Sequence, residues 1–104
     1  MRNAPRHLSS KTRAWWKRYV KENNFRESQL QLLTLAGEAW DRSAQARCIL
    51  DEQGLTYMDR FGQPRARPEI DIENKAKLTF EKLIKNLARE TADLPDWFKN
   101  AKLK

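Results

Sequence analysis

GLTYMDRFGQPRARPE, residues 54–69, decides how this chain folds, because it separates two long segments with helical patterns. Gly54 favours the end of a helix, since glycine adopts a positive φ without strain. The run from Asp59 to Gly62 has the pattern of a tight turn, with β-favouring residues around it. Pro68 suits the first position of a new helix. We therefore predict a short β-hairpin at about residues 55–66 that reverses the chain.

The segments around this hairpin are predicted to be helices. About residues 27–53 contain no proline and carry leucine and alanine on more than one face, which at ~1.5 Å per residue gives a helix about 40 Å long. About residues 68–90 have an apolar stripe at helical spacing, made of Ile72, Ala76, Phe80, Leu83, Ile84 and Leu87. A further helix at about residues 9–23 starts near Ser9 or Ser10, either of which is a good N-cap. The predicted fold class is mainly α, with three helices and one hairpin.

Composition limits the classes of function. A chain of 104 residues is long enough for one small domain. Cys48 is the only cysteine, which excludes an intrachain disulfide and favours a reducing compartment, and we expect it to be a small buried thiol. His7 is the only histidine, so a zinc site of cysteines and histidines within one chain is excluded. No apolar run approaches the ~20 residues of a membrane-spanning helix and no signal peptide opens the chain, so we expect no membrane partner.

Catalytic motifs are missing from the sequence. It has no glycine-rich phosphate loop, no HExxH motif, no acidic metal cluster and no nucleophile with a nearby histidine pattern. Asp59 is a conceivable metal ligand or general base, but an aspartate in a turn far more often accepts backbone N–H bonds. We therefore expect a protein that is not an enzyme and needs neither cofactor nor metal.

Positive charge is concentrated near the N-terminus. The chain has 21 Lys and Arg against 14 Asp and Glu, and its first 25 residues hold seven basic groups and one acidic group. On a helical wheel, one arc of the first helix is apolar and the opposite arc is cationic. The candidate phosphate contacts are this arc and the basic lead, namely Arg2, Arg6, Lys11, Arg13, Lys17, Arg18 and Lys21. The plainer alternative is a solvated helix face, although such faces usually mix both signs of charge.

Two further sets of residues, a pair of tryptophans and the arginines of the hairpin, each have two possible roles. Trp15 and Trp16 are able to stack on bases, but they lie on the arc opposite the lysines, so core packing is favoured. A second set of candidate DNA contacts consists of Arg60, Arg65 and Arg67 in the hairpin, which lie either on a DNA-facing surface or at a subunit boundary.

The long central helix has more apolar surface than two neighbours readily cover. We interpret part of it as a subunit interface, with a tight monomeric core as the alternative. The candidate interface residues are Leu32, Leu35, Ala36, Gly37, Ala39 and Trp40. Glycine costs a helix about 1 kcal/mol relative to alanine, so Gly37 indicates a close approach by another segment.

The chain divides into a flexible basic lead at residues 1–8, a helical oligomerisation and DNA-binding core at residues 9–90, and a tail at residues 91–104. Trp97 and Phe98 in this tail either fold back onto the domain or dock a protein partner, since aromatic residues are enriched at binding hot spots.

Four motifs stand in a characteristic order after HLSSKTRAWWKRYV. They are AWDR at 39–42, AR at 46–47, GLTYMDRFGQ at 54–63, and a proline that opens a helix bearing an IE pair at 72–73. In this order and spacing, over roughly residues 7–87, the chain resembles the short, all-helical, single-domain small subunits of bacteriophage terminases.

This resemblance implies a non-enzymatic subunit for viral genome packaging in the cytoplasm of a bacterial host. Such a subunit forms a homo-oligomeric ring, binds double-stranded viral DNA at the packaging start, and recruits and regulates the large terminase subunit that holds the ATPase and nuclease. Two other functions remain open from the residues alone: a small DNA-binding regulator of helix-turn-helix type, and an adaptor that binds a protein through its tail and touches no nucleic acid.

Overall fold

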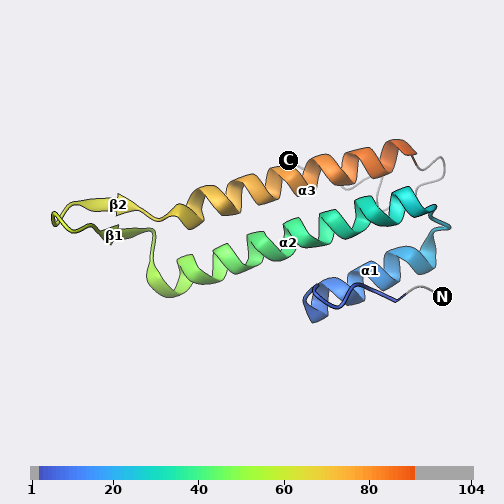
Figure 1. Ribbon diagram of the computed structural model, residues 1–104, viewed down its shortest axis with the longest axis horizontal. Helices are drawn as coiled ribbons and strands as arrows, with labels where there is room; N and C mark the ends of the chain where they lie inside the picture. The colour runs from blue at the N-terminus through green and yellow to red at the C-terminus, as the bar shows by residue number, and fades with distance from the viewer. Residues whose placement is uncertain (1–2, 91–104) are drawn as a thin grey trace.

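The computed structural model describes residues 3–90 as an elongated, mainly helical domain (Figure 1). Its overall dimensions are 55 × 28 × 20 Å. In chain order its elements are α1 (Ser10–Glu22), α2 (Glu27–Gln53), β1 (Thr56–Met58), β2 (Pro64–Ala66) and α3 (Pro68–Glu90). The predicted fold class of three helices with one hairpin is therefore confirmed, and the element bounds agree to within a residue or two.

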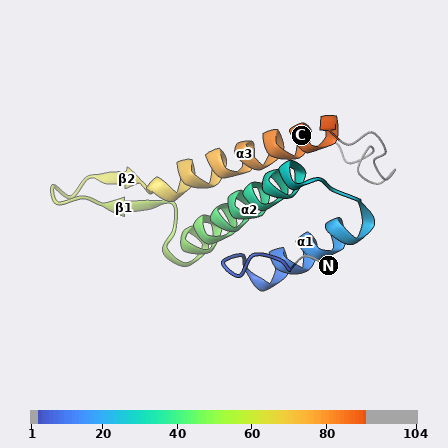
Figure 2. The same ribbon diagram turned by 45° about the vertical axis from the view of Figure 1, so that its right-hand side comes forward.

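α2 and α3 form an antiparallel pair, and the hairpin projects beyond the end where the chain passes from one to the other (Figure 1). α1 lies along the N-terminal half of α2 and leaves the C-terminal half of α2 paired with α3 alone (Figure 2). The core is deepest where all three helices meet, at the fully buried side chains of Leu33 in α2 and Leu87 in α3. The half of the molecule nearest the hairpin is thus only two helices thick.

The N-terminal lead is part of this core, which the sequence did not predict. Ala4 and Leu8 are 8% and 3% exposed, although residues 1–8 are expected from the sequence to be a flexible lead. Leu8 lies against the helix surface at Gly37, where an added Cβ would be only 3.2 Å from its Cδ1 atom. Gly37 therefore makes room for the chain's own lead and for Thr12 of α1, whose Cγ2 atom would be 3.0 Å from the same Cβ.

The hairpin has the predicted turn. Gly62 has a φ of 73° and its N–H donates to the carbonyl oxygen of Asp59 at 3.0 Å. Gly54, which follows α2, has a φ of 83°. β1 and β2 are antiparallel, with Tyr57 opposite Arg65, and every residue of both strands is exposed. The hairpin is therefore an arm that no other described part of the chain covers.

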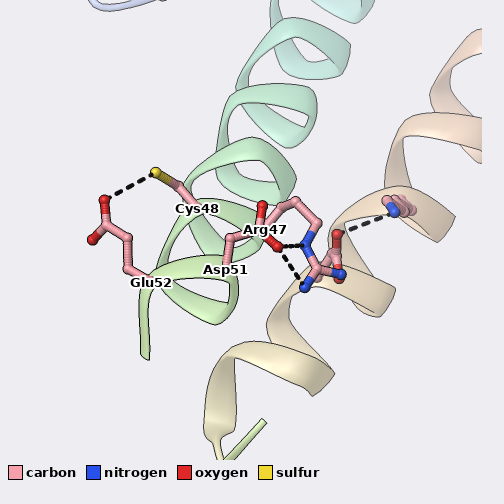
Figure 3. Close-up of polar contacts among 6 residues, drawn as sticks. Arg47, Cys48, Asp51 and Glu52 are labelled. Atoms are coloured by element: carbon pink, nitrogen blue, oxygen red, sulfur yellow. Dashed lines mark hydrogen bonds and ion pairs between the residues drawn. The ribbon is translucent and has the colours of Figure 1, made fainter. Parts of the chain in front are cut away.

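Near its C-terminal end, α2 carries polar contacts instead of a buried thiol (Figure 3). Cys48 is exposed, and its Sγ atom lies 3.7 Å from Oε1 of Glu52, so the prediction of a buried thiol is wrong. The reason is that only α3 covers this half of α2, which leaves the opposite face to solvent. Arg47 pairs with Asp51 at 3.1 Å and also reaches the largely buried carboxylate of Glu73 on α3 at 3.4 Å.

Among residues 3–90, no helix combines the length and apolar character needed to cross a bilayer. The same residues contain no group of three or more potential metal-ligating side chains.

Candidate nucleic-acid interface

The cationic arc of α1 faces solvent because its opposite arc is buried. Trp16 and Tyr19 are 3% and 2% exposed, and Thr12 is equally buried one turn earlier. The exposed side chains of the arc are Lys11, Lys17, Arg18 and Lys21. No carboxylate within residues 3–90 forms an ion pair with any of these four. We call these four residues the α1 cationic face.

The other candidate contacts near the N-terminus are less uniform. Arg13 is half-buried, and its Nη2 atom lies 3.4 Å from the hydroxyl of Ser10. Arg6 is exposed at the end of the lead. Arg2 lies outside the described residues.

Asp41 of α2 orients the α1 cationic face, and sequence reasoning missed this role. Its Oδ2 atom accepts the backbone N–H of Ser9 at 2.7 Å, and its Oδ1 atom accepts the hydroxyls of Ser9 at 2.8 Å and Thr12 at 2.6 Å. Ser9 also caps α1 by accepting the N–H of Thr12. Asp41 therefore fixes the first turn of α1 against the middle of α2. The signal available in the sequence was the aspartate of AWDR together with the Ser and Thr of LSSKT, which are separated by about thirty residues.

These bonds also lower the pKa of Asp41. Partial burial raises the pKa, but the hydrogen bonds from the Thr12 hydroxyl and from the N–H and hydroxyl of Ser9 stabilise the carboxylate and outweigh burial. The net result is a pKa below the ordinary value of 3.8, so the carboxylate is charged at neutral pH. Its charge faces the N-terminal end of α1, where the helix dipole favours an anion.

The tryptophans of α1 serve mainly in packing. Trp16 is buried and donates its Nε1–H to the hydroxyl of Thr34 at 3.2 Å, so it is not available to stack on a base. Trp15 is half-buried between Tyr19 and Phe80, with ring centroids 5.6 and 6.1 Å away. Trp15 also lines a cavity of about 360 Å³ between the three helices, together with Lys11, Thr12, Trp40 and Phe80.

The three hairpin arginines differ in their surroundings. Arg65 donates to Oδ2 of Asp59 at 2.9 Å. The guanidinium of Arg67 lies 5.8 Å from the ring centre of Tyr57, and that of Arg60 lies 4.9 Å from the ring of Phe61 at the tip. The hairpin and α1 lie at different positions along the molecule (Figure 1), so they are two separate basic surfaces.

The six candidate interface residues do not form one exposed patch. Ala36, Gly37 and Ala39 are buried within the protomer, so their surface is not free to contact a second copy. Leu32 is half-buried. The remaining two side chains are about half exposed, at 48% for Leu35 and 49% for Trp40.

The tail at residues 91–104, with Trp97 and Phe98, lies outside the described residues.

Compared with models of protein families, with curated proteins and with solved structures, this chain matches none.

Proposed function

We propose that this protein is a terminase small subunit that binds double-stranded viral DNA and acts as a homo-oligomer in genome packaging. The observation that carries the DNA-binding part is the α1 cationic face, which is exposed and unpaired within the described chain. From Lys11 to Lys21 it extends about 15 Å along the helix. Duplex DNA carries a negative charge every ~1.7 Å of its axis, so several phosphates fall within that length.

The assignment to genome packaging rests on the order of motifs that resembles terminase small subunits. In this proposal the chain is not an enzyme and uses no cofactor. It acts in the cytoplasm of a bacterial host, where it recruits the large terminase subunit that supplies the ATPase and nuclease. The exposed Leu35 and Trp40 support self-association, because the buried centre of a protein interface is more apolar than the remaining surface and is enriched in aromatic residues.

DNA binding is tested by the salt dependence of affinity for a mixed-sequence duplex. Fluorescence anisotropy with the Lys17→Glu/Arg18→Glu variant should show weaker binding to all sequences. The slope of log affinity against log salt should become shallower by about 2, because about 0.9 counterion is released per phosphate contact.

The matched control is Lys82→Glu/Arg89→Glu on α3, which makes the same change in net charge at exposed positions. It should leave the slope nearly unchanged. If the two variants lose DNA affinity equally, only the total charge of the protein matters, and the assignment of the DNA contact to α1 is refuted.

Oligomerisation is tested by native mass spectrometry of the full chain. A closed ring of several copies supports the proposal. A monomer that binds no duplex DNA contradicts it and favours a protein-binding adaptor.

A further inference from the structure

The hairpin arm has two chemically different faces. Because side chains alternate along a strand and Tyr57 pairs with Arg65, these two residues share one face, as the contacts between Arg65 and Asp59 and between Arg67 and Tyr57 confirm. The opposite face consists of Thr56, Met58, Pro64 and Ala66, none of which is charged. The arm is thus cationic and aromatic on one side and largely apolar on the other.

Phe61 occupies the tip of the arm and is 72% exposed, the largest exposed fraction among the exposed large apolar residues of the described chain. Its position is well defined, since Oδ1 of Asp59 accepts the backbone N–H groups of both Phe61 and Gln63 at 2.9 Å. Together with Arg65, these bonds hold the pKa of Asp59 below its ordinary value, the Gln63 bond contributing most. The turn therefore presents a hydrophobic ring to solvent in a preorganised place.

Charge favours a nucleic acid over a protein strand as the partner of this arm. Residues 55–67 contain three arginines and a single acid, Asp59, whose carboxylate is already engaged. Each strand of this two-stranded sheet has one free edge, and on the β2 edge Pro64 has no N–H to donate to an added protein strand. A polyanion, in contrast, is attracted by Arg60 beside the tip.

We propose that the hairpin enters the minor groove of double-stranded DNA and that Phe61 inserts between two stacked base pairs and bends the duplex. Apolar side chains used in this way unstack a base step and kink DNA by about 20–90° toward the major groove. Arg60 neutralises a phosphate beside the inserted ring, and the uncharged face with Met58 and Pro64 lies along the sugars of the groove wall. Pyrimidine–purine steps are the easiest to open, so the arm prefers them. This inference rests on the proposed DNA binding.

The test uses the full chain and a duplex of about 30 base pairs with a central TA step, a length over which bending is measurable. Donor and acceptor dyes at the two ends report bending by energy transfer, and 2-aminopurine at the central step reports unstacking by increased fluorescence. Wild-type protein is expected to raise both signals. Phe61→Ala should abolish both and weaken binding by on the order of tenfold or less, because the α1 cationic face still holds the phosphates.

Two matched variants sharpen the result. Phe61→Leu keeps an apolar wedge and should retain most of the bending. Leu55→Ala removes a comparably exposed apolar side chain at the base of the arm, 57% exposed, and should change neither signal. None of these side chains is in the core, so circular dichroism should be the same for all variants.

The outcomes separate this inference from the proposed function. Wild-type protein that binds the duplex without bending it, or Phe61→Ala protein that bends it as the wild type does, overturns the inserted wedge and leaves the DNA-binding proposal in place. A wild-type chain that does not bind the duplex at all overturns both.

Discussion

A methyl group added at Gly37 measures how closely α1 and the lead pack on α2. The new Cβ would lie 3.0 Å from Cγ2 of Thr12 and 3.2 Å from Cδ1 of Leu8, both closer than ordinary van der Waals contact. Two effects oppose each other. Alanine is more favourable than glycine inside a helix by about 1 kcal/mol, whereas overpacking a core costs about 1–3 kcal/mol.

The steric effect should win because of how Thr12 is held. The Leu8 atom is the end of a flexible side chain and can shift. Thr12 cannot rotate freely, since its Oγ1 atom donates to Asp41 at 2.6 Å, and β-branched residues have few χ1 rotamers in a helix. We expect Gly37→Ala to lower the free energy of unfolding by about 1 kcal/mol, the difference between the two opposing terms.

The assay is urea unfolding followed by tryptophan fluorescence, at one fixed protomer concentration because self-association also changes apparent stability. Thr12→Ser is the matched background, since it removes the Cγ2 methyl and keeps the hydroxyl that binds Asp41. In that background Gly37→Ala should become neutral or stabilising by up to about 1 kcal/mol. If Gly37→Ala stabilises the wild-type protein, or has the same effect in both backgrounds, then contact with Thr12 is not the reason for glycine at this position.

Two further predictions concern charged groups. Asp41→Asn should lower the free energy of unfolding at pH 7 by about 1 kcal/mol, because hydrogen bonds to a charged acceptor are stronger than those to a neutral one. Folding lowers the pKa of Asp41 below its ordinary value of 3.8, so the carboxylate stabilises the fold above that value and loses this effect as the pH falls through the folded-state pKa. The urea midpoint of the variant should therefore change less than that of the wild type below about pH 4. A midpoint equally sensitive to acid in both proteins would contradict this. Arg47→Ala should lower the free energy of unfolding by about 1 kcal/mol, because it removes one of the two cations that pair with the buried Glu73. This figure is kept small because the guanidinium is partly exposed to solvent. Adding Glu73→Gln to the Arg47→Ala variant should restore most of the lost stability in urea unfolding. If it restores none, the loss comes from the packing of the Arg47 side chain and not from its charge.

Local chemistry explains why the helix bounds and the hairpin were predictable. Gly54, the turn from Asp59 to Gly62, and Pro68 each act through their own backbone, and Ser9 caps the helix that it begins. The docking of the lead was not predictable in this way. Ala4 and Leu8 are too few to form a periodic pattern, and their burial depends on a glycine about thirty residues further along the chain.

In the candidate site, too, properties of a single helix were predictable from the sequence and contacts between helices were not. Helical periodicity separated the α1 cationic face from the buried arc, because both properties belong to one helix. Burial of Ala36 and Ala39 and exposure of Cys48 depend on which faces of α2 the neighbouring helices cover, which no local pattern records. For this reason the predicted interface contained residues that the folded protomer already uses.

Asp41 connects the stability of the fold with the strength of the proposed DNA site. An unpaired carboxylate near the α1 cationic face would repel phosphates and reduce its attraction for DNA. Here that carboxylate accepts three hydrogen bonds from the first turn of α1, which places it beneath the helix and near its positive end. Together with the burial of Trp16 and Tyr19, the same bonds hold α1 in the rotation that keeps Lys17 and Arg18 outward. We therefore expect Asp41→Asn to weaken DNA binding in the anisotropy assay, although it removes a negative charge, because it loosens the first turn of α1; tighter binding by the variant would contradict this.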